Sequence, residues 1–329
     1  MERMEVYKGK SSKVAKKSRR NKAWVRTGGF LLIIVFVFLS VRYFHAEQFW
    51  KETRKFFVDN PLILLIVTIC YFLSFCLRAE AWRIYLGKKV RYFSCLQGLL
   101  FSLFINHITP IKAGDAVRIG VLSWREKHIS TSISAHSVVV LRVLDMLILL
   151  LFSFMGLLAF SRGILFKSSI VLLIAAFVFI ILAIWFLRRY LPKLFKKHLH
   201  LLKNSFQAKN FLPIFTLTVL SWALEGVVVF GVTSSIGQHL GPFKAIWVNS
   251  ITVGGQVFQI TPGGISTYES VMTAALTSFH YPVREGYMVA LISHSYKFIF
   301  SYFAGIMLLL ISPAVKMQQI KALLRLRRG

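Results

Sequence analysis

The chain has 329 residues, of which 56% are hydrophobic and 16% are charged, and its mean hydropathy is +0.63. This composition excludes a disordered protein and an ordinary soluble domain, because apolar stretches of about 20 residues, each long enough to cross a bilayer, recur along the chain. Lysine and arginine total 41 against 12 aspartates and glutamates. Such an excess suggests nucleic acid in a soluble protein, but in a membrane protein it first reports orientation, and we expect no nucleic-acid partner.

The predicted elements begin with a basic cytoplasmic segment, 1–27, and an apolar stretch, 28–44, that has no small-residue cleavage site and is therefore a retained first span. His45 to Asp59 are expected to form an interfacial helix on the outer surface. Further full spans are predicted at 61–77, 132–160, 168–187, 211–235 and 286–312, before a basic tail at 313–329. The three cysteines, Cys70, Cys76 and Cys95, match no metal-ligand spacing, and we expect them to be buried apolar residues.

Residues 93–124 are apolar but do not fit a simple span, because basic residues flank both ends and Thr109-Pro110 and Gly114 interrupt the middle. Two full crossings need about 40 residues plus a turn, and only 32 are available. The pattern predicts a re-entrant hairpin of two short helices. Residues 245–280 repeat the pattern around Thr261-Pro262 and the following glycines, which predicts a second hairpin.

Broken helices at membrane depth are tolerated only where they are buried in protein or line a cavity, so the two hairpins are the strongest functional signal. The predicted fold is an all-α polytopic membrane protein with about six full spans and two re-entrant broken-helix hairpins. Hydropathy alone counts about seven to eight transmembrane segments.

The basic charge orients these elements. With both termini in the cytoplasm, the inside segments carry 29 lysines and arginines and the outside segments carry 7. The transmembrane domain, 28–312, then consists of a repeat at 61–160 and an inverted repeat at 211–312, joined by the span 168–187. Pro110 to Arg142 and Pro262 to His294 are both 32 residues apart. Inverted repeats with broken helices are typical of alternating-access transporters.

Charged residues inside the spans are the first candidates for a site. Arg142 and Asp145 share one face of a predicted helix near mid-span, and either lock two helices as an ion pair or bind a head group. Glu225 is a lone carboxylate in a span, and His294 and Lys297 share a face at i and i+3. Glu225 either pairs with Lys297 or Arg142, or forms a cation or proton site.

The first hairpin offers Asn106, Thr109, Lys112, Asp115 and Arg118. Asp115 is also a suitable N-cap for the returning half-helix.

The second hairpin offers Gln259, Thr261, Ser266 and Glu269, together with Gly263 and Gly264. Ser266 to Glu269 match a capping box, which by itself explains Glu269. The alternative is that the free N–H groups and positive dipole end of this half-helix bind an anionic phosphate. Arg78, Glu80 and Arg83 lie at a predicted cytoplasmic helix end, where snorkelling explains them.

Three motifs, NHITPIKAGDAVR, LRVLD and TPGGISTYE, occur in this order over the apolar chain. With them the chain resembles the transmembrane-region family of lysylphosphatidylglycerol synthases, the flippase part of multiple peptide resistance factors and their stand-alone relatives. The resemblance covers about residues 28 to 315, and the chain departs from it at Leu141, where an acidic residue is expected, and at Ser266, where glycine is expected. It implies roles for Asn106, Pro110, Gly114, Asp115, Arg118, Arg142, Asp145, Pro262, Gly263, Gly264 and Glu269.

Three functions fit these features. The first is a flippase for an anionic or aminoacylated phospholipid or a polyprenyl-phosphate lipid, with Arg142, Lys112 and Arg118 holding phosphate and Asp115, Asp145, Glu225 or Glu269 meeting a cationic head group. The second is a subunit of a lysyltransferase in lipid modification and cationic peptide resistance. Full-length relatives carry the transfer domain after the last span, where this chain has only Pro313 to Gly329, so a separate enzyme partner is expected. The third is an envelope-biosynthesis scaffold. No cofactor or metal is expected.

Overall fold

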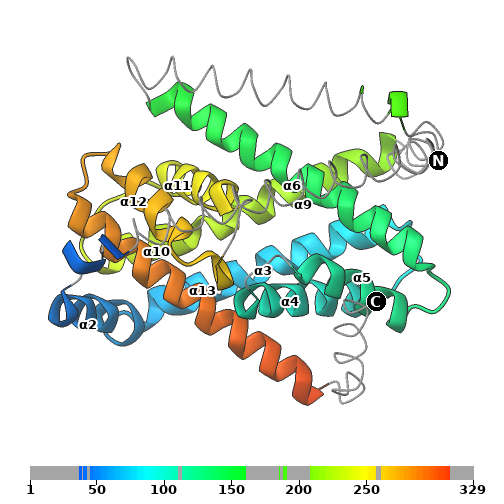
Figure 1. Cartoon of the computed structure of the whole chain (residues 1–329), viewed down its shortest axis with the longest axis horizontal. Coiled ribbons are helices and arrows are strands. Elements are labelled where there is room, and N and C mark those ends of the chain that lie inside the picture. The colour runs from blue at the N-terminus through cyan, green and yellow to red at the C-terminus, as the bar shows by residue number, and fades with distance from the viewer. Residues whose placement is uncertain are drawn as a thin grey trace, which may run out of the picture.

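The computed structural model describes residues 37–38, 40–42, 45–109, 113–160, 185, 188–190, 208–256 and 261–311, and the regular structure in these ranges is helical (Figure 1). Four described helical segments are long and apolar enough to cross a membrane, namely Pro61–Tyr85, Thr131–Phe160, Asn210–Ser235 and Val283–Ile311. The predicted all-α polytopic fold is therefore confirmed. The predicted segments 1–27, 28–44, 168–187 and 313–329 lie wholly or largely outside the described residues.

The first half of the domain contains α3 (Pro61–Tyr85), α4 (Tyr92–Ile108), α5 (Gly114–Arg125) and α6 (Thr131–Phe160). With 17 and 12 residues, α4 and α5 are about 26 and 18 Å long, which is shorter than a hydrocarbon core. Helix α4 ends at Thr109, whose extended φ of −94° and ψ of 143° are the conformation that a following proline favours. The short-helix pair predicted here is present, while residues 110–112 lie outside the described ranges.

The second half contains α9 (Ala208–Glu225), α10 (Val227–Ser235), α11 (Pro242–Gly255), η3 (Pro262–Gly264), α12 (Thr267–Thr277) and α13 (Val283–Ile311). Its order of long, short, short and long segments repeats that of the first half. The span predicted at 211–235 is interrupted at Gly226, which separates α9 from α10. A Cβ on Gly226 would lie 2.9 Å from the Cα of Ile246, so the closeness of α11 requires glycine there.

The first long segments of the two halves pack against each other and run antiparallel. Near the start of α3, Val67 lies against Gly231 of α10, whereas further along α3 Arg78 contacts Ser221 and Glu225 of α9. The α4–α5 and α11–α12 hairpins consequently lie toward opposite ends of the molecule (Figure 1).

Each half also packs its last long helix on the hairpin of the other half, α6 on α11 and α13 on α4. Gly156 of α6 receives the ring of Trp247, and Gly305 of α13 receives the ring of Phe104. A Cβ on either glycine would lie within 2.3 Å of that ring. The two cross-half contacts are thus built in the same way, as expected for an internal two-fold relation.

Helix α2 (Ala46–Arg54) and the π-helical turn η1 (Lys55–Asp59) precede α3. The helix predicted between His45 and Asp59 is therefore present. Phe56 is fully buried and its ring lies edge-on to Tyr296 of α13, 5.8 Å between centroids, while Trp50 is exposed. The position of this helix at the outer membrane surface stays a prediction.

Candidate functional site

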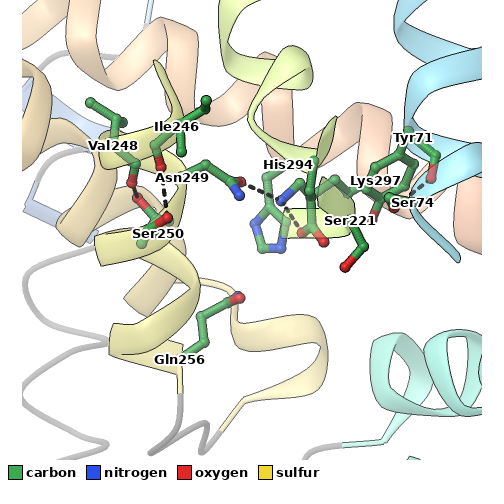
Figure 2. A network of polar contacts seen from close by, with 12 residues as sticks. Tyr71, Ser74, Ser221, Ile246, Val248, Asn249, Ser250, Gln256, His294 and Lys297 are labelled. Carbon is green, nitrogen blue, oxygen red and sulfur yellow. Dashed lines mark hydrogen bonds and ion pairs between the residues drawn. The ribbon is translucent and has the colours of Figure 1, made fainter. Parts of the chain in front are cut away.

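Four polar side chains from four helices meet in the centre of the bundle: Arg78, Glu225, Asn249 and Lys297, here called the central ion cluster. Lys297 extends from α13 and donates hydrogen bonds to Oε1 of Glu225 and Oδ1 of Asn249, both 3.0 Å long (Figure 2). Arg78 pairs with the other oxygen of Glu225 and donates from Nε to Ser221, 3.2 Å away. Glu225 and Lys297 are 5% and 4% exposed, so the carboxylate is enclosed by its two cations.

Arg78 lies inside the bundle and not at a helix end, where the sequence interpretation placed it. Its guanidinium lies 4.0 Å from the ring of Trp222 and 5.0 Å from the ring of Phe75, both in cation–π geometry. Snorkelling to the surface is therefore wrong for this residue, because the aromatic faces and Glu225 hold its charge inside the bundle.

Arg142 and Asp145 do not form the intrahelical ion pair considered from their spacing. Asp145 is buried and accepts a hydrogen bond of 2.9 Å from Nε1 of Trp222 on α9. Arg142 instead faces α5, where its Nε lies 4.0 Å from Oδ2 of Asp115. The two side chains contact different neighbouring helices. Their spacing of i and i+3 predicts a shared face but not these separate partners.

Asp115, Arg118 and Arg142 form a second group, the first-hairpin charges. The 4.0 Å contact of Arg142 with Asp115 is too long for a hydrogen bond, and their side chains are 32% and 35% exposed. Within the described ranges, the Nε of buried Arg118 has no hydrogen-bond partner, and its guanidinium lies 4.1 Å from the ring of Trp82. Among the described residues, this group therefore has one buried donor without a hydrogen bond, on Arg118, and a loosely paired cation, Arg142.

The first hairpin is closed by Asn106 rather than by Asp115. The Oδ1 of Asn106 accepts the backbone N–H of Gly114, 2.8 Å away, at the start of α5. The cap position is Ala113, and Asp115 lies in the first turn of the helix, where its charge meets the positive dipole end. The expected capping role of Asp115 is thus wrong. Thr109 donates to the carbonyl of Ile105, and Lys112 lies outside the described residues.

The second hairpin is held by the pair Glu269 and His294. Glu269 accepts the backbone N–H of Ser266 at 2.6 Å, and the predicted capping box is present. Its other oxygen lies 2.6 Å from Nδ1 of His294, whose Nε2 lies 3.1 Å from the carbonyl of Gly263. The carboxylate of Glu269 thus occupies the helix end at which the alternative interpretation places a phosphate.

The turn before α12 explains the glycines of the TPGG motif. Gly263 and Gly264 have φ values of +64° and +79°, a region that favours glycine. Thr261 donates from Oγ1 to the carbonyl of Ile265, 2.5 Å away. These three candidate residues shape the turn, and the ring of Tyr268 stacks on His294 with centroids 4.1 Å apart.

Sequence reasoning did not single out several side chains that complete these groups, namely Trp82, Ser221, Trp222, Asn249 and Tyr268. None of them carries a charge, so nothing in the sequence distinguishes these side chains from their neighbours. Within the described ranges, no three His, Cys, Asp or Glu side chains gather closely enough to hold a metal ion.

The chain is similar to a UPF0104 membrane protein of Archaeoglobus fulgidus, with 30% identity over 121 residues. The match covers 36% of this chain and 35% of that relative, so it spans about a third of the relative's length. No solved structure matches the chain. The family model described as "Lysylphosphatidylglycerol synthase TM region" matches residues 27–305, which include both hairpins and all the groups described above. The chain belongs to the lysylphosphatidylglycerol synthase transmembrane-region family.

Proposed function

We propose that this protein moves an anionic or aminoacylated phospholipid of the lysylphosphatidylglycerol type, or a polyprenyl-phosphate lipid, between the leaflets of a membrane. The observation that carries this proposal is the contrast between the two charged groups of the domain. The central ion cluster is enclosed and internally paired, whereas Arg142 and Asp115 of the first-hairpin charges are partly exposed and loosely paired, beside buried Arg118. An incompletely paired charge at a broken helix can bind a charged lipid head group.

In this mechanism Arg142 and Arg118 bind the phosphate. Their planar guanidinium groups present several N–H donors to phosphate oxygens, and the N-terminus of α5 adds a positive dipole end. Asp115 lies 4.0 Å from Arg142 and meets a cationic substituent such as a lysyl group. The acyl chains remain in the surrounding lipid while the head group crosses.

Leaflet exchange in liposomes tests the proposal. Purified protein is reconstituted with chemically reducible fluorescent phosphatidylglycerol and lysylphosphatidylglycerol, and wild type is compared with Arg142→Gln and Arg142→Lys. We expect Arg142→Gln to slow exchange at least about tenfold, because it removes a charge-assisted contact. Arg142→Lys keeps the charge without the fork geometry and should retain part of the rate.

Lys127→Gln is the matched control, since Lys127 is exposed in the loop after α5 and contributes to neither charged group. Full exchange by Arg142→Gln would remove the head-group role of the first hairpin. Absence of exchange for every lipid, including a polyprenyl phosphate, by correctly inserted wild type would refute the transport function.

The family description also favours a second candidate, because it names a synthase. In that case the membrane domain serves a separate enzyme that transfers lysine to phosphatidylglycerol. This candidate is tested by adding lysyl-tRNA and phosphatidylglycerol to the purified chain, with and without a candidate partner enzyme, and measuring the lysylphosphatidylglycerol formed. Formation of aminoacylated lipid by the chain alone would support an enzymatic rather than a transport role.

We further propose that the protein resides in a bacterial plasma membrane with both termini in the cytoplasm. The 29 basic residues of the inside segments against 7 outside support the orientation, and the family resemblance supports the bacterial plasma membrane. In this orientation the α4–α5 hairpin enters from the cytoplasm and the α11–α12 hairpin from outside.

A further inference from the structure

A chain of hydrogen bonds runs from the backbone of the second hairpin through two titratable side chains. The N–H of Ser266 donates to Oε2 of Glu269, Oε1 of Glu269 faces Nδ1 of His294, and Nε2 of His294 faces the carbonyl of Gly263. Both residues are 3% exposed. His294 thus joins α13 to the turn at Gly263.

The partners of this pair determine how many protons it holds. A carbonyl oxygen only accepts, so Nε2 of His294 must carry a hydrogen to bond Gly263. Nδ1 then either carries a second hydrogen, as an imidazolium beside a carboxylate, or accepts one from a protonated Glu269. Either arrangement holds one proton more than a carboxylate beside a neutral imidazole. The observed contacts therefore require a bound proton.

We infer that Glu269 and His294 form a proton-binding site that locks the turn of the second broken helix, and that this proton is the coupling ion of the domain. The site itself rests on the geometry above, whereas its coupling to lipid movement rests on the proposed function.

Among the described residues, few other titratable groups surround the pair. Tyr268 of α12 stacks on His294, and His107 of α4 lies with its ring centroid 6.4 Å away. On α13 itself, Lys297 is one turn along and Tyr287 lies near Glu269. The charge of Lys297 is compensated by Glu225 of α9, at 3.0 Å. Arg78 of α3 pairs with the same carboxylate.

His107 is separately engaged, since its Nδ1 lies 2.9 Å from the carbonyl of Leu103. Among the described residues, no other carboxylate contacts the pair. The bound proton is therefore shared between Glu269 and His294 alone.

Loss of the proton weakens the turn. The proton leaves to water, the carboxylate of Glu269 keeps the hydrogen on Nδ1, and the lone pair of Nε2 then faces the lone pairs of the Gly263 carbonyl. Among the described residues, the Gly263 carbonyl then keeps the hydrogen bond from Nε2 of Gln256, which is 3.1 Å long. Gly263 and Gly264 both have positive φ, so the turn can change conformation with little steric cost once the bond is lost.

The Glu269→Gln variant should keep the hydrogen-bond pattern of the protonated pair without binding the extra proton. The amide oxygen can accept the N–H of Ser266 while the amide nitrogen donates to Nδ1 of a neutral His294, which leaves Nε2–H on Gly263. This variant should therefore keep the turn locked at every pH. Deuterium uptake of the peptide spanning residues 261–270, corrected for intrinsic exchange at each pH, measures the lock in the purified full chain without any transport.

We expect the wild-type peptide to lose protection at least about tenfold between pH 5.5 and pH 9, since a hydrogen bond involving a charged group is worth more than that factor. Glu269→Gln should show no such change, and His294→Gln should be unprotected throughout that range. His128→Gln, at an exposed histidine in the α5–α6 loop, should behave as wild type.

Wild-type protection that does not change with pH, or a Glu269→Gln variant that follows wild type, would overturn the proton site. If Glu269→Gln does not fold, ¹⁵N spectra of the histidine rings in wild type and His128→Gln decide, since the site requires one buried imidazole that loses a hydrogen over this range. Leaflet exchange under an imposed pH gradient then tests coupling. A proton site without lipid exchange would refute the proposed function alone, and exchange without the proton site would refute this inference alone.

Discussion

Glu225 is the carboxylate that faces two cations, the buried Lys297 and the largely enclosed Arg78. We predict that Glu225→Gln destabilises the folded protein by about 3–5 kcal/mol, because removing one partner leaves buried charge uncompensated. Thermal or denaturant unfolding in detergent measures the change. The double variant Glu225→Gln/Lys297→Met should recover part of this loss, since it also removes one of the stranded cations. Equal instability of the single and double variants would contradict the pairing.

Ser266 has a φ of +80° and a ψ of −48°, a strained conformation for a residue with a Cβ. We predict that Ser266→Gly is neutral or stabilises by up to about 1 kcal/mol, because relief of backbone strain exceeds the small cost of glycine at a cap. Ser266→Ala is the matched comparison. It keeps the strain and loses the hydroxyl, and should lower the melting temperature. A glycine variant that melts below the alanine variant would show that backbone strain contributes little to stability at this position.

The same position shows how far a single residue can be interpreted before the fold is known. Glycine is expected at Ser266 from the family resemblance, and its positive φ supplies the physical reason. Charged residues in apolar stretches, such as Glu225 and Lys297, are conspicuous in the sequence. Their partners are not, because pairing depends on how each helix is rotated about its axis. The sequence alone places Arg78 at a helix end for this reason.

At the scale of elements, the first hairpin depends on a close approach of α4 and α5. A Cβ on Gly114 would lie 2.3 Å from the carbonyl oxygen of Ser102, a backbone atom that cannot move aside. We predict that Gly114→Ala destabilises by about 1–3 kcal/mol through overpacking. Gly254→Ala in α11 is the control, because nothing lies within 4 Å of its added Cβ. Equal effects of the two changes on the melting temperature would contradict this packing.

Glu126, in the loop that follows α5, predicts a pH dependence of stability. Burial raises the pKa of Glu126, but hydrogen bonds from Ser94 and Arg91 outweigh this effect and hold the pKa below its ordinary value. A lowered folded-state pKa stabilises the protein above the unfolded value, and this contribution is lost as pH falls through the folded value. Glu126→Gln should therefore melt lower than wild type at pH 7, and the difference should shrink as pH falls below the ordinary glutamate range and vanish once pH is below the lowered folded-state pKa. A difference that persists in acid would show that packing, not ionisation, is responsible.

The hairpins could be predicted because their signals are local. A proline after threonine, glycines nearby and a stretch too short for two crossings are all visible in the sequence. The interruption of the α9–α10 segment at Gly226 could not be predicted in the same way. A lone glycine in an apolar stretch is common, and the reason for this one is the backbone of α11, 2.9 Å from a would-be Cβ.

At the scale of the whole molecule, the two halves share an architecture but differ in chemistry. Arg142 and Asp145 lie as far after Pro110 as His294 and Lys297 lie after Pro262. Asp145 and Lys297 both contact α9, through Trp222 and Glu225. Arg142 is loosely paired, however, while His294 is bound to Glu269 and Gly263. One half thus has a loosely paired cation at this position, and the other uses its equivalent position to hold a turn.

The inverted arrangement predicts on which side of the membrane each hairpin enters. The α3–α4 loop and the α10–α11 loop lie at opposite ends because α3 and α9–α10 run antiparallel. Exposed Lys89 marks the first loop and exposed His239 the second. In a background with the three native cysteines replaced by alanine, Lys89→Cys should react with an impermeant maleimide only after cell lysis, and His239→Cys should react in intact cells.

The reason for this polarity is charge. Residues 78–92 carry five lysines and arginines, whereas between α10 and the body of α11 the one lysine or arginine is Lys244. Labelling of both sites from the same side would contradict the inversion itself, since α3 and α9–α10 could not then be antiparallel spans. Labelling of Lys89→Cys alone in intact cells would preserve the inversion and reverse the orientation. The first-hairpin charges would then lie on the outer side, and the head group would enter from there.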